Sequence, residues 1–305
     1  MDGKPARLLF RFYFFLISIF VCLLPFALSA AEIRILFSTC LNGNLDGCTC
    51  KTTPVSGLAK RGAFIAEYRK KHPEMILLDS GDLIDDPKDT AKAAAIFNSY
   101  RLLQYDAVLP GDQDVMLGLD ELKMYSKTVP IIAANLEQVD GLLFKNQNRI
   151  FQPYLKLTRN RTNVIVLGVL HREAFRFAKL KQGDAIEIAP PETAIGDAPA
   201  SDLLILLSHG GMDVDRNLTR NISRPLILIG GHDQSLIKNG PGIRWTENVW
   251  YFQSGRDGNM LGEIVVETKS GGKYEIKSHR LIEFDYATSL DHPQIRQMTE
   301  SIEKK

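Results

Sequence analysis

A short apolar run that ends in a glycine beside carboxylates is the feature that most constrains the fold of this chain. Residues 75–78 are apolar, and Asp79, Ser80, Gly81 and Asp82 follow them. The run is short enough for a buried strand, and the Ser-Gly pair predicts a turn at its carboxyl end. Ligands of open α/β sheets bind at that edge, and glycine lets the backbone turn sharply enough to present a carboxylate to an ion. Asp82 is therefore a candidate metal ligand, with a turn or helix-capping aspartate as the alternative.

The same pattern recurs further along the chain. Three later strand-like runs also end in a glycine next to Asp or His: 107–109 before Gly111-Asp112, 203–207 before His209-Gly210, and 226–229 before Gly231-His232. The alternative for each histidine is an ordinary polar residue near a loop, with its hydrogen bonds satisfied by protein groups. Because the two histidines both follow apolar runs and stand beside glycines, we expect them to be metal ligands with Asp82 and Asp112.

The other segments alternate between strand-like and helix-like patterns. The further strand candidates are 33–38, 130–135 and 164–170, and the helix candidates are a segment capped by Ser56, then 90–104 and 119–127. Residues 249–286 alternate apolar and polar, as antiparallel strands do. The first half of the chain alternates strands with helices, and the last part consists of strands. This order predicts a layered α/β domain with two packed sheets.

Length and charge limit the domain organisation and the partners. A chain of 305 residues can bury a full core as one large domain or two small ones. We predict one domain over 32–286, followed by a charged tail over 287–305. The 37 basic residues against 36 acidic ones give no electrostatic footprint for nucleic acid, so we expect no nucleic-acid partner.

The segment 1–31 has the pattern of a signal peptide. Basic residues precede the apolar run 12–28, and three small residues at 29–31 offer a cleavage site. We therefore predict an exported protein, periplasmic or extracellular, whose mature chain starts near Glu32. The alternative is an uncleaved membrane anchor, since the run approaches the length of a span.

Three cysteines lie within eleven residues of the predicted mature chain: Cys40, Cys48 and Cys50. An odd number in an exported protein leaves at least one thiol free, bound to metal or paired with another molecule. A bridge between Cys48 and Cys50 would be strained, so a bridge from Cys40 or the ligation of a soft metal is easier. Unreactive thiols in a surface loop are the alternative. We treat the three as candidate redox residues.

Four motifs together resemble the calcineurin-like metallophosphoesterase superfamily. They are Ser80-Gly81-Asp82, Gly111-Asp112-Gln113-Asp114, Ser208-His209-Gly210 and Gly231-His232-Asp233-Gln234. The most similar branch is the periplasmic 5'-nucleotidase and UDP-sugar hydrolase group, over about residues 33–267. The resemblance implies a four-layer α/β/β/α fold, in a single domain, with a two-metal site on loops at the strand ends.

The departures from that family affect one metal more than the other. The first metal motif of the family, Asp-x-His, reads Cys40 and Asn42 here, and its final histidine is Gln234. One ligand set of the resemblance thus becomes Cys40, Asn42, Asp82 and Gln234, which is poor in charge. The other becomes Asp82, Asp112, His209 and His232, which suits zinc, manganese or iron. We expect one tight divalent metal site, with Cys40, Asn42 and Gln234 as further candidate ligands.

The catalytic motif has changed as well. The resemblance implies a catalytic histidine at the position of Gln113, followed by Asp114. A glutamine cannot exchange a proton near neutral pH, so general acid or base help at this position is missing. His171, after the run 164–170, is a weak candidate to replace it.

Two functions of different class remain open. The first is metal-dependent hydrolysis of phosphoric or related esters, with a small phosphoester or sulfur compound as substrate. The second is a catalytically impaired relative that acts in thiol redox, sulfur or metal binding through the cysteine loop. Both are compatible with an exported protein tethered to a membrane by its first segment.

Overall fold

The computed structural model describes residues 31–45, 47, 57–139, 147–238, 240–269, 273–284 and 289–303. The predicted signal peptide lies outside these residues except for Ala31, and Cys48, Cys50 and the expected cap Ser56 lie outside them too. Within the described part, no helix has the length and apolar character that a membrane span needs.

The first sheet has five strands and carries the amino-terminal motifs. Its order is β14 (Lys273–Glu283), β13 (Met260–Lys269), β1 (Ala31–Ser38), β2 (Ile76–Asp79) and β3 (Ala107–Val108). β1, β2 and β3 are parallel, whereas β13 runs antiparallel to β1 and β14 antiparallel to β13. Ser38 is in register with Asp79, and Asp79 with Val108. The three parallel strands therefore end side by side, and the loops after them leave the sheet at one edge.

The second sheet has six strands and carries the histidine motifs. Its order is β11 (Ile243–Arg244), β12 (Val249–Phe252), β10 (Leu226–Gly230), β9 (Leu203–His209), β7 (Thr162–Leu170) and β6 (Tyr154–Arg159). The four central strands are parallel, and β11 and β6 run antiparallel at the edges. A small third sheet joins β5 (Gln147–Arg149), β4 (Leu136–Val139) and β8 (Ile186–Ile188).

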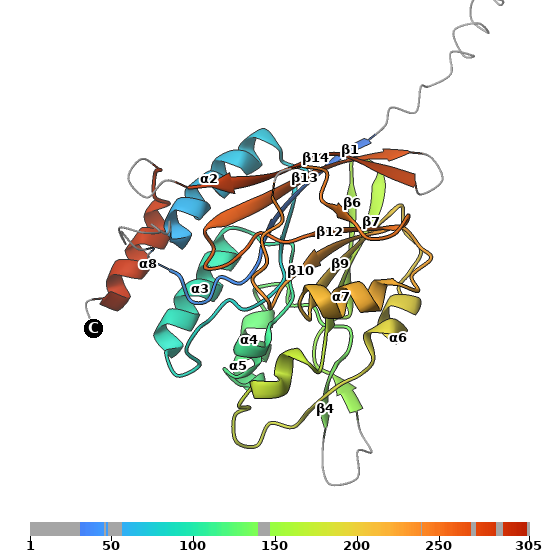
Figure 1. Cartoon of the computed structure of the whole chain (residues 1–305). Coiled ribbons are helices and arrows are strands. Elements are labelled where there is room, and N and C mark those ends of the chain that lie inside the picture. The colour runs from blue at the N-terminus through green and yellow to red at the C-terminus, as the bar shows by residue number, and fades with distance from the viewer. Residues whose placement is uncertain are drawn as a thin grey trace, which may run out of the picture. The chain divides into compact units, whose positions relative to one another are not determined.

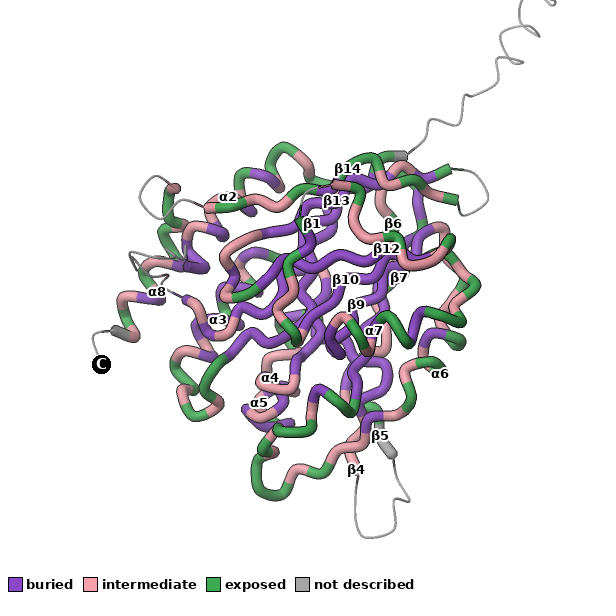
Figure 2. Tube along the Cα trace, viewed as in Figure 1, coloured by how far each residue is buried: buried purple, intermediate pink, exposed green. Residues whose placement is uncertain are grey.

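The described part of the chain is built in four layers, as expected. Helices α2 (Leu58–Lys71), α3 (Thr90–Leu102) and α8 (Pro293–Glu303) cover one side, α6 (Pro191–Gly196) and α7 (Met212–Thr219) cover the other, and the two sheets lie between them (Figure 1). Leu203, Ile205 and Leu207 of β9 join the core shared with the first sheet. Leu204 and Leu206 instead face the cluster that contains Ile195 of α6 and Leu218 of α7. The buried residues concentrate in these central strands (Figure 2).

Local sequence explains where several helices begin and end. Asp89 caps α3 because its carboxylate accepts from the backbone N–H of Lys92 at 2.9 Å. α2 ends in Arg69, Lys70 and Lys71, whose charges suit the carboxyl end of a helix dipole. α8 comes from the segment predicted to be a charged tail, and its Ile295 is fully buried in the main core.

Two expectations about strands are wrong. Residues 130–135 form only isolated bridges, in which Ile131 pairs with Val108 of the first sheet and Ile132 with Gln152 beside the second. This segment passes between the two sheets, so it cannot continue as a strand of either one. Residues 249–286 are not all antiparallel, because β12 pairs in parallel with β10. The alternation in the sequence reports burial on one face and not the direction of the neighbouring strand.

Candidate metal centre

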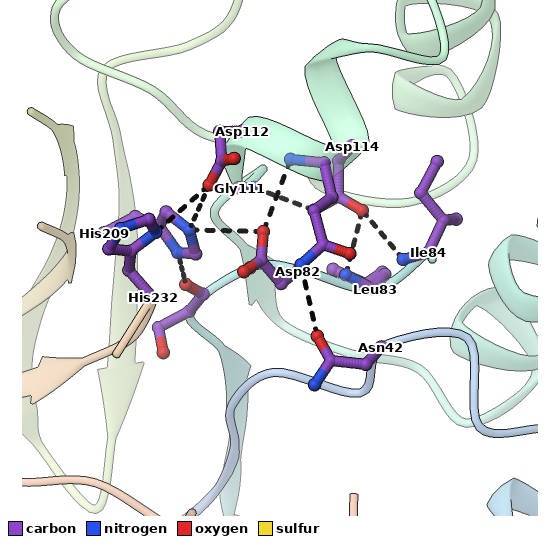
Figure 3. A network of polar contacts seen from close by, with 12 residues as sticks. Asn42, Asp82, Leu83, Ile84, Gly111, Asp112, Asp114, His209 and His232 are labelled. Carbon is purple, nitrogen blue, oxygen red and sulfur yellow. Dashed lines mark hydrogen bonds and ion pairs between the residues drawn. The ribbon is translucent and has the colours of Figure 1, made fainter. Parts of the chain in front are cut away.

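Four side chains with ligand chemistry meet where the two sheets end. Asp82 follows β2, and Asp112 is the first residue of the short helix α4 (Asp112–Val115) that follows β3. His209 is the last residue of β9, and His232 comes two residues after β10. Figure 3 shows their side chains pointing toward one another. The sequence pattern therefore brings together residues that lie 150 positions apart because the carboxyl ends of both sheets share this edge.

Strained backbone at these loops places the side chains. Positive φ angles occur at Asp82 (59°) and His232 (77°), and also at Cys40 (49°), Asn42 (49°) and Gln234 (59°). Non-glycine residues hold such angles at a cost of roughly 1–3 kcal/mol each and do so mainly at functional sites. The loops of this edge therefore carry strain at the positions that the sequence motifs identify.

Two glycines allow the loops to approach each other. A Cβ on Gly81 would lie 2.6 Å from the backbone nitrogen of Gly111, and a Cβ on Gly111 would lie 2.2 Å from Oδ1 of Asp82. Any side chain at either position would push the Asp82 and Asp112 loops apart. The glycines of the Ser-Gly-Asp and Gly-Asp-Gln-Asp motifs are thus required by close contact between two backbones.

The four candidate ligands form one group. One ligand atom from each of Asp82, Asp112, His209 and His232 lies within 4.8 Å of all the others. Nε2 of His209 lies 3.2 Å from Oδ1 of Asp82 and 3.2 Å from Oδ1 of Asp112. Nδ1 of His232 also lies 3.2 Å from Oδ1 of Asp112. These separations are short enough for a single ion to contact all four residues.

The tautomer of His209 is fixed by the backbone. This imidazole is fully buried, and its Nδ1 donates to the carbonyl oxygen of Ser80 at 2.8 Å. Nε2 is therefore the nitrogen that faces the two carboxylates, and it is the atom that would bind an ion while Nδ1 keeps its backbone partner. His232 is one-third exposed, with 34% of its side chain accessible, so the group is open to solvent on that side.

The electrostatics of the group favour a cation. Burial lowers the pKa of His209, but Asp82 and Asp112 outweigh this effect and raise the pKa well above its ordinary value. Burial raises the pKa of Asp112, but hydrogen bonds from His209 and His232 lower it well below its usual range. In both cases the carboxylates attract positive charge to the space between the four residues. The donor set of two imidazoles and two carboxylates fits a divalent metal ion.

Asp114 joins the loop of Asp82 to the loop of Asp112 through hydrogen bonds to their backbones. Its side chain is fully buried, and Oδ1 accepts from the backbone N–H groups of Leu83 and Ile84 at 2.9 and 3.1 Å. Oδ2 accepts from the N–H of Gly111 at 2.8 Å. Burial, followed by the nearby Asp82, raises the pKa of Asp114 to about 7. These contacts describe a positioning residue, and the catalytic role expected from the sequence stays a prediction.

Comparison with known proteins identifies the fold. The chain is 23% identical over 225 residues to a 5'-nucleotidase of Diplobatis ommata, covering 71% of this chain and 39% of that protein. It superposes on a 5'-nucleotidase precursor from Thermus thermophilus with a TM-score of 0.74 and 16% identity, over 90% of this chain and 59% of that one. The calcineurin-like phosphoesterase YfkN from Bacillus subtilis gives a TM-score of 0.66 and 17% identity, over 90% of this chain and 97% of that one. This is the calcineurin-like metallophosphoesterase fold.

The predicted resemblance, including the 5'-nucleotidase branch, is confirmed by these relatives. No family model matches the chain. The chain spans about two fifths of the length of the curated 5'-nucleotidases it matches, with 39% of the Diplobatis ommata protein covered. The four converging residues are the same four that the motifs predicted as the better ligand set, and their metal binding stays a prediction.

The other predicted ligand set consists of Asp82 and three residues without a carboxylate or an imidazole, namely Cys40, Asn42 and Gln234. Asn42 donates from Nδ2 to Oδ1 of Asp257 at 3.1 Å and accepts at Oδ1 from Nε2 of Gln113 at 3.3 Å. Both ends of this amide therefore bind protein groups. Gln234 lies on the His232 loop in a left-handed conformation. Asp82 is the only charged member of this set.

Cys40 is buried beside the centre but does not belong to the ligand group. Its side chain is fully buried, and its thiol lies near the backbone N–H groups of His232 and Gln234. Burial, followed by the charge of Asp82, raises the pKa of the thiol well above its ordinary value. Among the described residues, the only group of three or more His, Cys, Asp and Glu ligand atoms excludes Cys40. Metal ligation by Cys40 thus gains no geometric support, and its pairing with Cys48 or Cys50 concerns residues outside the described part.

His171 does not lie in the position of the missing catalytic histidine. Its Nε2 is 3.0 Å from Oγ of Ser208 and 3.4 Å from Oδ1 of Asp215, in a separate buried cluster. Gln113 instead stands beside the centre, with its backbone N–H 3.4 Å from Oδ1 of Asp82. The sequence analysis missed Asp257, which binds Asn42. The turn signal Gly255-Arg256-Asp257-Gly258 after β12 could have drawn attention to this loop.

Proposed function

We propose that the chain is an exported, metal-dependent hydrolase of phosphoric or related esters with one tight metal site. The convergence of Asp82, Asp112, His209 and His232 within 4.8 Å carries this proposal. The relatives named 5'-nucleotidase and calcineurin-like phosphoesterase support the class of substrate, a small phosphoester. Nucleotide specificity is not part of the proposal, because the chain covers only part of those nucleotidases.

The ligand chemistry supports zinc, manganese or iron as the cofactor. Two imidazoles and two carboxylates are common first ligands for these ions. A divalent ion held by the four residues would act as a Lewis acid toward an ester oxygen and make water a stronger nucleophile at neutral pH. The Ser80 carbonyl holds the proton on Nδ1 of His209, so Nε2 is the nitrogen that would give up its proton and bind that ion.

The residues around the centre favour slow chemistry. Gln113 can hydrogen-bond a substrate oxygen through its amide but cannot donate or accept a proton there. Loss of general acid–base help costs about 10²–10⁴-fold in rate. The uncharged set of Cys40, Asn42 and Gln234 leaves the second ion of the family without anionic ligands except Asp82. We therefore propose a single tight ion and weak activity on simple phosphate esters.

Export follows from the predicted signal peptide at 1–31, with a membrane tether as the alternative. Relatives from secreted sources, such as a snake venom 5'-nucleotidase of Crotalus adamanteus, are consistent with this localisation. Sequencing the amino terminus of the protein from periplasmic and membrane fractions would decide between a cleaved signal peptide and a membrane anchor. A start near Glu32 supports cleavage, and a chain that retains residues 1–31 in the membrane fraction supports the anchor.

Metal content and hydrolysis together test the proposal. After extensive dialysis, the protein should retain about one ion per chain and hydrolyse p-nitrophenyl phosphate in a reaction that a chelator stops. His209→Ala should lose both the ion and the activity, because it removes the ligand that bridges Asp82 and Asp112. His72→Ala, at the carboxyl end of α2 where the imidazole packs against Tyr68, is the matched control and should keep both.

Three results would count against it. Two equally occupied ions after dialysis would contradict the single site. Retention of the metal in His209→Ala would contradict the assigned ligands. A fully metal-loaded protein that hydrolyses neither phosphate monoesters nor diesters nor the sulfur analogues would contradict the hydrolase. That result would favour the alternative function in thiol redox, sulfur or metal binding.

A further inference from the structure

The proposed centre supplies too little positive charge for a phosphate group. Asp82 and Asp112 balance the charge of one divalent ion, so the loaded centre is close to neutral. A phosphomonoester is a dianion near neutral pH, and sites that bind phosphoryl groups surround them with cations. The positions of the second ion, Cys40, Asn42 and Gln234, contribute no charge. A cation from another part of the chain is therefore needed.

The loop after β12 is tied to the first-motif loop. Thr39 Oγ1 donates to the carbonyl oxygen of Gly255 at 3.1 Å, and Asn42 Nδ2 donates to Oδ1 of Asp257 at 3.1 Å. Nδ2 of Asn44 donates to the carbonyl oxygen of Asp257. Asp257 itself has a positive φ of 56°. Thr39, Asn42 and Asn44 of the first-motif loop thus hold the conformation of this loop.

A continuous chain of contacts leads from a proposed ligand to a guanidinium group. Oδ1 of Asp82 lies 3.4 Å from the N–H of Gln113, whose Nε2 donates to Oδ1 of Asn42 at 3.3 Å. Asn42 donates to Asp257, and Oδ2 of Asp257 accepts from Nε of Arg256 at 2.7 Å. Each link is a polar contact, so the loop that carries Arg256 is joined by hydrogen bonds to the loops that carry Asp82 and Gln113.

Arg256 is available to bind an anion. Its side chain is 65% exposed, and in the described part of the chain only its Nε has a hydrogen-bond partner. The two terminal nitrogens remain free, and a guanidinium can donate from two nitrogens to two oxygens of one phosphate. The bond from Nε to Asp257 orients the group without using those donors.

We propose that Arg256, oriented by Asp257, binds the phosphoryl group of the substrate through its two terminal nitrogens. This inference rests on the proposed function, because it assumes a phosphoester at the metal centre. Asn42 has a new role in this arrangement, since its amide holds Asp257 instead of a metal. Arg256 binds substrate, and Asp257 is a positioning residue.

Binding of inorganic phosphate tests the inference without turnover. Isothermal titration of the metal-loaded full chain with phosphate should show affinity about tenfold weaker in Arg256→Ala, the lower range for a charge-assisted hydrogen bond at an exposed site. Arg256→Lys should recover part of the loss, because it keeps the charge but not the paired donors. Arg296→Ala removes an arginine from an exposed ion pair on α8 and should bind phosphate like the unmodified protein. Metal content is measured in every variant.

Kinetics add a second readout. With p-nitrophenyl phosphate, Arg256→Ala should raise KM about tenfold with a smaller change in kcat, and Asp257→Asn should raise KM less. Equal phosphate affinity in Arg256→Ala and the unmodified protein at equal metal content would overturn the inference, as would no phosphate binding by the unmodified protein. Arg256-dependent phosphate binding without any ester hydrolysis would uphold the inference and overturn the hydrolase, so the two failures are distinguishable.

Discussion

At the scale of single residues, Gln113 limits what the centre can catalyse. It occupies the first turn of α4 beside Asp112, is half-buried, and donates its amide to Asn42. The neighbouring Asp114 is committed to three backbone N–H groups and cannot replace it. The lack of a proton donor or acceptor at this position is therefore due to the single side chain of Gln113.

Gln113→His should raise turnover of p-nitrophenyl phosphate by about 10²-fold, the lower limit for general acid–base help. The histidine would occupy a position next to a proposed ligand on the same short helix. The comparison is made at equal metal content, with Gln138→His on β4 as the control, since Gln138 binds Lys123 away from the centre. Unchanged or lower turnover in a fully loaded variant would show that another step is limiting.

Cys40 separates the two proposed classes of function. Cys40→Ala should keep about one bound ion per chain, because the thiol is not among the atoms that converge within 4.8 Å. Elemental analysis compares the metal content of this variant with that of Asp82→Ala, which should lose the ion. If the Cys40 variant also loses its metal while remaining folded, a thiolate ligand is present and the sulfur-based alternative gains support.

At the scale of elements, the β13–β14 hairpin buries a histidine in an apolar setting. His279 on β14 lies between the rings of Phe37 and Phe252, with centroid distances of 6.3 and 4.9 Å. Burial lowers its pKa from 6.5 to about 4. The folded protein therefore keeps this imidazole neutral over a pH range in which the unfolded chain binds a proton.

The sign of the resulting pH dependence is fixed. Because the folded pKa lies below the unfolded one, this group's contribution is fully present above pH 6.5 and is lost as the pH falls toward about 4. The loss amounts to about 2–3 kcal/mol of unfolding free energy. His279→Phe should remove most of it, whereas His72→Phe, just after α2, should not. Denaturant unfolding from pH 7 to pH 4 measures both, and equal slopes for all three proteins would contradict the assignment.

At the scale of the whole molecule, the candidate metal centre joins the two sheets. Asp82 and Asp112 follow strands of the first sheet, and His209 and His232 follow strands of the second. An ion bound by all four would therefore link two halves of the core that also meet through apolar packing and through hydrogen bonds such as that from His209 to Ser80. Metal binding should stabilise the entire fold and not only the loops.

Saturating metal should accordingly raise the melting temperature. At a free ion concentration of about 100 times the dissociation constant, binding contributes about 2.7 kcal/mol, or roughly 4–5 °C for a chain of this size. Differential scanning fluorimetry with zinc, manganese and iron, each against chelator, ranks the three ions as well. His209→Ala should show no metal-dependent shift, and a shift that survives in this variant would place the stabilising ion elsewhere.

The order of the motifs predicted both the fold and the ligand group. Short apolar runs followed by Gly with Asp or His are local signals, since burial and turn chemistry act within a few residues. For that reason the strands before Asp82, Asp112, His209 and His232 were found with their approximate ends. α7 was missed because it spans only eight residues (Met212–Thr219), which is shorter than the window in which helical spacing is usually recognised. The parallel pairing of β12 was missed because alternation indicates burial and not the direction of the neighbouring strand.

Only the tertiary structure decided which polar groups meet. The contact of Asn42 with Asp257 joins residues 215 positions apart, and nothing near either one in the sequence signals the other. The same holds for Asp114, whose three partners lie on two different loops, and for His171, which binds Ser208 and Asp215 instead of serving the centre. Sequence specifies the side chains and the local turns, but the packing of two sheets fixes the distances between them, because those distances depend on every residue in the shared core.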